Sequence, residues 1–164
     1  MALTNKTRGG LAAIVGAAAA AALLYLVPNN EGTVLKTYKD LGGVLTYCTG
    51  ATEDAQWGKS YTKAECAAQL NKDLERHAAG IQACMQPSWD RLTDGQKIAY
   101  VDTAFNIGVA AFCGSTMAKA TNAGDVVKGC AALALWVNVN GKPVNGLVKR
   151  RAIARAFCEG RTPV

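Results

Sequence analysis

Two carboxylates and a hydroxyl lie close together in a short stretch near the amino terminus. Asp40 follows Glu31 by nine positions, and Thr46 comes six positions later, just past a pair of glycines. Hydrolysis of a sugar acetal needs one carboxyl to protonate the leaving oxygen, a negative charge to stabilise the oxocarbenium-like transition state, and a group that holds water. These residue types therefore favour glycosidase chemistry.

The spacing also restricts the local structure. Residues nine apart on one helix point to nearly opposite faces, so a shared site requires the chain to turn between Glu31 and Asp40. The residues from 33 to 47 are rich in β-branched and aromatic types, which favour extended backbone, and Gly42–Gly43 permits a tight turn. We expect a short β-hairpin that brings the two carboxylates together.

This stretch closely resembles the catalytic motif of the phage-type lysozymes, in which Glu, Asp and Thr are separated by eight and five residues. Tyr38 and Gly50 match two further positions of the motif, whereas Cys48 stands where the family often has glycine. The resemblance extends over roughly residues 30 to 160 through the blocks Leu92–Gln96, Ile98–Gly108, Ser115–Thr116, Trp136, Gly141–Pro143 and Gly146–Arg151.

The resemblance implies an α+β, lysozyme-like fold for residues 29–164, with a small β-hairpin lobe, a larger helical lobe and a cleft between them. It implies hydrolysis of the β-1,4 bond between N-acetylmuramic acid and N-acetylglucosamine in peptidoglycan, which causes lysis of the host cell. The protein is expected to act as a monomer and without a cofactor.

The resemblance also assigns roles to individual residues. Glu31, kept protonated by partial burial, would donate a proton to the leaving oxygen. Asp40 would stay ionised and stabilise the cationic sugar, while Thr46 would hold the attacking water. The implied inversion at the anomeric carbon requires carboxyl groups roughly 6.5 to 9.5 Å apart. The family positions that face the glycan are matched by Phe105, Asn106 and Ser115.

Two other classes of protein remain open. A lytic transglycosylase would cleave the same bond with a single acid and would need neither Asp40 nor Thr46. A non-catalytic wall-binding membrane protein would keep the fold without needing Glu31.

The first 28 residues differ in composition from the rest of the chain. Lys6 and Arg8 precede Gly9–Val27, an uncharged stretch of 19 residues, about the length of a membrane-spanning helix. Its many alanines and glycines leave few strongly apolar side chains, which supply only about 2 to 4 kcal/mol of insertion free energy. The sequence predicts a weak membrane segment with its amino terminus in the cytoplasm.

Three interpretations of this segment are open: a cleaved signal peptide, a permanent anchor, and a signal-anchor-release segment of the kind carried by some phage endolysins. The third is favoured, because it resembles such segments in being weakly apolar and rich in Ala and Gly. It implies an enzyme held inactive at the bacterial inner membrane and later released into the periplasm. Glu31 lies four residues beyond Val27, within about 14 Å of the segment's end.

The six cysteines all follow this segment, and an even number in an exported domain indicates disulfides. The sequence does not select one pairing. Joining neighbours along the chain gives 48 with 66, 84 with 113, and 130 with 158. No two cysteines have the close spacing of zinc ligands, so no metal site is expected.

The remaining sequence favours helices. Thr62–Glu65 and Thr93–Gln96 have the pattern of capping boxes, and residues 125–136 and 146–158 are further helix candidates, whereas 51–60 is expected to be a loop.

His77, the one histidine, lies in a polar helical run, which favours a solvent-exposed position and disfavours zinc or Cys–His peptidases. The net charge of +6 suits anionic envelope polymers. The basic run Lys149–Arg151 lacks nearby stacking aromatics, so nucleic acid is not an expected partner.

Overall fold

The computed structural model describes residues 10–162, so Lys6, Arg8 and Gly9 of the predicted membrane segment lie outside the described residues. The elements follow in the order α1 (Leu11–Val15), α2 (Ala17–Glu31), β1 (Val34–Lys39), β2 (Leu45–Cys48), α3 (Lys63–Cys84), α4 (Asp94–Ile107), α5 (Val109–Cys113), α6 (Thr116–Asn122), α7 (Val126–Ala131), β3 (Asn138–Val139), β4 (Lys142–Pro143) and α8 (Asn145–Cys158). Short 3-10 turns occupy Trp89–Arg91 and Ala132–Leu135.

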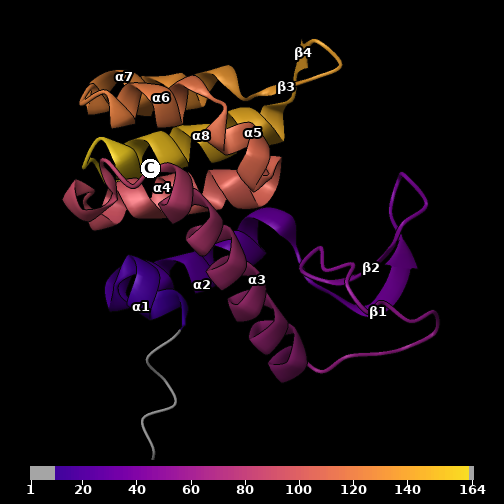
Figure 1. The fold of residues 1–164 in the computed structure, drawn as a ribbon. Coiled ribbons are helices and arrows are strands. Elements are labelled where there is room, and N and C mark those ends of the chain that lie inside the picture. The colour runs from indigo at the N-terminus through magenta and orange to yellow at the C-terminus, as the bar shows by residue number, and fades with distance from the viewer. Residues whose placement is uncertain (1–9, 163–164) are drawn as a thin grey trace, which may run out of the picture.

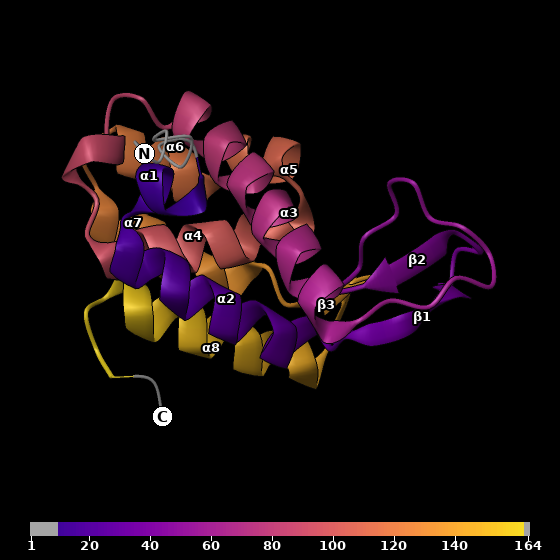
Figure 2. The same ribbon diagram turned by 90° about the horizontal axis from the view of Figure 1, so that it is seen from below.

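The helices gather into one lobe, and the β1–β2 hairpin projects from its side (Figures 1 and 2). Within the helical lobe, α4 packs against both α2 and α8, and α3 crosses from the helical lobe towards the hairpin. This arrangement confirms the expected α+β class with a small hairpin lobe and a larger helical lobe.

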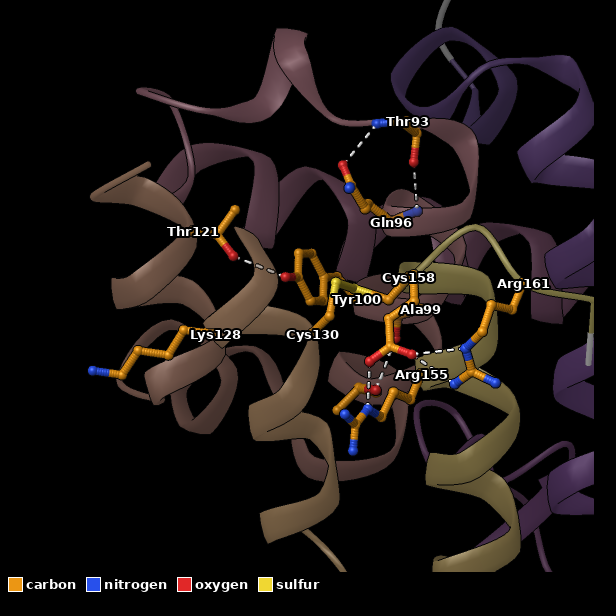
Figure 3. Close-up of a disulfide and its surroundings, with 12 residues drawn as sticks. Thr93, Gln96, Ala99, Tyr100, Thr121, Lys128, Cys130, Arg155, Cys158 and Arg161 are labelled. Carbon is orange, nitrogen blue, oxygen red and sulfur yellow. Dashed lines mark hydrogen bonds and ion pairs between the residues drawn. A yellow bond between two sulfur atoms is a disulfide. The ribbon is translucent and has the colours of Figure 1, made fainter. Parts of the chain in front are cut away.

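The helix starts follow from local side-chain chemistry. Thr62 and Glu65 form a reciprocal capping box at the start of α3, and Thr93 and Gln96 form another at the start of α4 (Figure 3). Both predicted boxes are confirmed. The helix expected over 125–136 is shorter, because α7 ends at Ala131 and the chain continues as a 3-10 turn.

The hairpin has the predicted antiparallel pairing and an irregularity in β1. Val34 lies opposite Cys48 while Tyr38 lies opposite Thr46, so four steps along β1 correspond to two along β2. The extra residues of β1 pair with the following loop instead, through the backbone bonds Thr37 N to Lys59 O and Tyr61 N to Leu35 O. A bulge of this kind bends the strand that contains it.

The apolar amino-terminal segment forms two helices rather than one. Gly16 separates α1 from α2 with φ +92°, a backbone conformation that side-chain-bearing residues rarely adopt. Both helices contribute fully buried side chains to the main hydrophobic core: Leu11, Val15, Ala19, Leu23 and Val27. Among residues 10–162, no helix combines the length and the apolar character needed to span a membrane.

The disulfides join Cys48 to Cys66, Cys84 to Cys113 and Cys130 to Cys158, which confirms the pairing of neighbours along the chain. The first disulfide ties β2 to the start of α3, so the hairpin lobe is covalently fastened to the helix that spans the two lobes. The third joins the end of α8 to α7, beside the buried hydrogen bond between Tyr100 and Thr121 (Figure 3).

Candidate active site

Glu31 is the last residue of α2, and the helix stops there because Gly32 takes a positive φ of +76°. The Glu31 side chain is 28% exposed, and its Oε1 accepts a hydrogen bond from Nη1 of Arg150 on α8. No hydrogen bond to Oε2 is found among the described residues. One oxygen of the carboxyl group is therefore held and the other is free.

Arg150 is itself fixed by a buried ion pair with Asp102 of α4. The Arg150 Nε and Nη2 atoms lie 3.1 and 2.8 Å from the two Asp102 carboxylate oxygens, and the side chains are 6% and 1% exposed. Burial alone lowers the pKa of Arg150, but its bonds and charge interactions with Asp102 and then Glu31 outweigh burial and raise that pKa. Asn30 also donates to Asp102, at 3.3 Å. Glu31 thus faces a cation whose charge is largely balanced by Asp102.

A pocket of about 240 Å³ opens beside Glu31. Its walls come from both lobes: the loop after β2 on one side, and α3 and α4 on the other. The lining residues are Glu31, Thr49, Gly50, Ala51, Thr52, Glu53, Asp73, Arg76, His77, Phe105 and Asn106. The pocket is the part of the described structure that matches the expected cleft, and it brings together three of the predicted site residues: Glu31, Phe105 and Asn106.

Asp40 and Thr46 lie in the hairpin and are not among the residues that line this pocket. Asp40 Oδ1 accepts the backbone N–H groups of Gly42 and Val44, each at 2.9 Å, so its carboxylate organises the turn between β1 and β2. Thr46 is buried, and its hydroxyl donates to the carbonyl of Val44 at 3.0 Å. Local bonds therefore fix both side chains.

Comparison with known proteins identifies the family. The phage lysozyme family matches residues 28–154. A SAR-endolysin of Bacteriophage PS119 is 37% identical over 96% of this chain and 97% of its own length. The muramidase domain of SpmX from Asticaccaulis excentricus has a TM-score of 0.76 at 26% identity, covering 84% of this chain and 94% of that domain. An endolysin from Escherichia coli O157:H7 phage FAHEc1 has a TM-score of 0.73 at 27% identity, covering 87% and 94%.

The chain belongs to the phage lysozyme family. It is therefore a glycoside hydrolase of the lysozyme type that acts on peptidoglycan, and its relatives place it with the SAR-endolysins. Residues 10–162 contain no group of three or more His, Cys, Asp or Glu that could hold a metal ion.

In this phage lysozyme Ser115 has a structural position. It caps α6 by accepting from the backbone of Ala118, and its buried hydroxyl donates to the carbonyl of Phe112 at 2.6 Å. Ser115 is not among the pocket-lining residues. Its predicted glycan contact stays a prediction.

His77 is placed differently from the sequence expectation of a solvent-exposed helix residue. Its ring is half-buried, lines the pocket and lies against Phe105, with the ring centroids 5.0 Å apart. A signal for this position exists in the sequence. His77 lies three residues after Leu74 and four before Ile81, so the helical period puts it beside the buried face of α3.

Arg151 is the second functional candidate for which the sequence predicted no role in the site. Its side chain is buried, and Nη2 donates to Oδ1 of Asn106, while Nε and Nη1 have no hydrogen-bond partner within residues 10–162. Burial, followed by the nearby Arg150 charge, lowers the pKa of Arg151 to about 10. Arg150, in the same basic run of α8, is paired with carboxylates, whereas Arg151 contacts the pocket residue Asn106 from inside the protein.

Proposed function

We propose that this protein is an endolysin that hydrolyses the β-1,4 bond between N-acetylmuramic acid and N-acetylglucosamine, with Glu31, Asp40 and Thr46 as its catalytic residues. The observation that carries the proposal is the held carboxyl of Glu31 at the edge of a pocket between the two lobes. The enzyme would act as a monomer.

Glu31 would act as the proton donor. Because Oε1 is bound by Arg150, the free Oε2 is the atom that would deliver a proton to the leaving oxygen. The Asp102 carboxylate balances the charge of Arg150, so this contact orients Glu31 without presenting it with an isolated buried cation.

Asp40 and Thr46 would act from the hairpin. The turn uses Oδ1 of Asp40, which leaves Oδ2 to face the cationic sugar in the transition state. Thr46 Oγ1 donates to Val44 and keeps its lone pairs for an attacking water. The bulge in β1 supports the proposal, because it bends the strand between Glu31 and Asp40.

The reaction can be tested with Glu31→Gln, which keeps the shape and a hydrogen-bond acceptor for Arg150 but cannot supply the proton. We expect the rate of turbidity loss of purified bacterial walls to fall by about 10² to 10⁴. Glu75→Gln on α3 is the matched control, since Glu75 does not line the active-site pocket, and should keep full activity. Activity retained in Glu31→Gln would rule out the assigned acid.

Mass analysis of the released fragments separates hydrolysis from transglycosylation. Hydrolysis adds water and gives reducing ends, whereas a lytic transglycosylase leaves anhydro ends. Finding only anhydro ends would replace the proposed reaction by the alternative.

We further propose that residues 1–28 serve as a signal-anchor-release segment, with Gly9–Val27 in the bacterial inner membrane before release into the periplasm. The names of the SAR-endolysin relatives and the weakly apolar composition support this. The burial of Leu23 and Val27 supplies the physical reason for inactivity. While these side chains are in lipid, they leave gaps in the core, and Glu31 is kept within about 14 Å of the membrane segment.

Residues 11–27 contribute side chains to the folded core, so deleting the segment is an unsuitable test of tethering. Ala17, Ala18 and Ala21 are exposed on α2, and leucine at these positions makes the segment more apolar without filling the core. We expect the triple leucine variant to stay in the membrane and to delay host lysis, while serine at the same positions should advance it. Lysis at the same time in all three proteins would contradict the tether.

A further inference from the structure

The amide of Asn106 has one defined orientation in the active-site pocket. Arg151 Nη2 is a hydrogen-bond donor with no acceptor capacity, so the Asn106 atom facing it must be the carbonyl oxygen. The Asn106 NH₂ group has no partner among the described residues. Because Asn106 lines the pocket, this NH₂ is a donor available to a ligand.

The His77 ring also has one defined arrangement, but it presents a hydrogen-bond acceptor where Asn106 presents a donor. Its Nδ1 lies 2.7 Å from the carbonyl oxygen of Asp73, which can only accept, so Nδ1 carries the hydrogen. In the neutral ring Nε2 is then an acceptor. Nε2 lies on the ring edge away from the bond to its own helix, and no described residue hydrogen-bonds to it.

Each of the other charged side chains around the pocket already takes part in an ion pair. Arg76 bonds to Glu53 at 3.3 Å and to Asp73 at 3.1 Å, and Glu31 is held by Arg150. The donor of Asn106 and the acceptor of His77 are thus polar groups on α4 and α3 that have no partner among the described residues. Phe105 precedes Asn106 and contacts the His77 ring, which adds an apolar surface next to both.

We propose that His77 and Asn106 together recognise the acetamido group of an N-acetylated amino sugar. The acetamido carbonyl would accept from Asn106 Nδ2, its N–H would donate to His77 Nε2, and its methyl group would lie against Phe105. Arg151 is a positioning residue, because it acts by holding the Asn106 amide. The inference rests on the proposed function and adds to it the feature of the glycan that is read at this pocket.

The chemistry of these three residues favours an acetamido group over a sugar hydroxyl. A hydroxyl can also donate to His77 and accept from Asn106, but it does so through a single oxygen and brings no methyl group for Phe105. An acetamido group carries a separate donor, a separate acceptor and an apolar end, one for each of the three residues. A site whose polar groups are fixed in advance discriminates strongly against a ligand that leaves them unpaired.

The test uses two substrates: peptidoglycan with its natural N-acetyl groups, and the same material after enzymatic de-N-acetylation. Release of reducing ends gives kcat/KM for wild type, His77→Phe and Asn106→Ala. His77→Phe keeps a ring against Phe105 but lacks Nε2. On the acetylated glycan each variant should lose about tenfold in kcat/KM, as expected for one hydrogen bond with a partner left unpaired. On the de-N-acetylated glycan each variant should equal wild type.

Two further variants separate recognition from a purely structural effect. Asn106→Asp keeps an acceptor for Arg151 but presents a negative charge, so it should lose activity on the acetylated glycan and keep or gain activity on the ammonium-bearing one. Arg151→Met frees the Asn106 amide to turn and should reduce the wild-type preference for the acetylated glycan. Gln82→Ala, elsewhere on α3, is the unchanged control.

The outcomes distinguish this inference from the proposed reaction. If wild type releases no reducing ends from acetylated glycan, the proposed function fails and the subsite fails with it. If wild type is active but each variant loses the same factor on both substrates, the acetamido assignment alone is overturned. Re-acetylation of the treated glycan must restore the wild-type rate, which separates loss of the N-acetyl group from other damage to the wall.

Discussion

Glu31 and Asp40 carry the same chemical group but are held by different kinds of structure. Glu31 is bound by Arg150, which lies 119 positions away along the chain and is itself paired with the buried Asp102. Asp40 is bound by backbone N–H groups two and four residues away. One carboxylate therefore depends on the assembly of α2, α4 and α8, whereas the other depends on a single turn.

Because of this difference, substitutions in the two regions should affect stability and catalysis to different extents. The Glu31 region is part of the core, so a change there affects both folding and activity. The hairpin tip is exposed, so we expect changes in its turn to have little effect on the helices. Substitutions at the two places should consequently have different ratios of stability loss to activity loss.

The largest effect is expected for Arg150→Met. This change leaves the fully buried Asp102 carboxylate without its cation, which should lower the free energy of unfolding by about 3 to 5 kcal/mol. Urea denaturation followed by circular dichroism measures the loss. The double variant Arg150→Met with Asp102→Leu replaces the whole pair by apolar groups and should recover most of that stability. A loss below about 1 kcal/mol in the single variant would mean that the Glu31 region does not depend on this pair.

The next effect concerns Asp40 and falls on activity. Asp40→Asn keeps an oxygen for the two turn N–H groups but removes the charge, so wall cleavage should fall about 10²- to 10³-fold while stability changes by less than about 0.5 kcal/mol. Asp40→Ala also removes the turn bonds and should cost about 1 kcal/mol more. Thermal melts and turbidity assays on the same samples separate the two contributions. Equal stability of the Asn and Ala variants would show that the turn does not need this carboxylate.

The same contrast explains what the sequence could predict. The two capping boxes, the hairpin and its turn depend on residues within a few positions of one another, and all were predicted. The disulfides also join neighbours along the chain. The family motif supplied Glu31 and its expected cleft partners Phe105 and Asn106.

Long-range partners were not predictable by the same means. Nothing near Asp102 indicates that a carboxylate inside a buried helix is paired with Arg150, because the pairing exists only once α4 and α8 are packed. The two-helix form of the amino-terminal segment was not predictable for the same reason. Its composition fits a continuous membrane helix, and the break at Gly16 becomes favourable only when α1 and α2 fold onto the core.

The smallest expected effect concerns Glu65, a carboxylate that is held, like Asp40, by hydrogen bonding to a nearby backbone N–H group. Glu65 completes the capping box of α3 by accepting from the backbone of Thr62 at 2.7 Å. This hydrogen bond, opposed by desolvation and aided by the Thr62 side chain and Lys59, lowers the pKa of Glu65 below its ordinary 4.5. A lowered folded-state pKa means that the stabilisation is present above pH 4.5 and is lost as the pH falls through the folded pKa.

Glu65→Gln keeps a capping-box acceptor but does not titrate. Wild type should therefore be slightly more stable than the variant at pH 6, and the difference should shrink as the pH approaches 3, as measured by urea unfolding at each pH. A difference that stays constant would mean that the charge of Glu65 adds nothing to the cap, and that a neutral acceptor is sufficient. Because the effect is confined to the first turn of α3, wall cleavage at neutral pH should not change, unlike the result expected at Asp40.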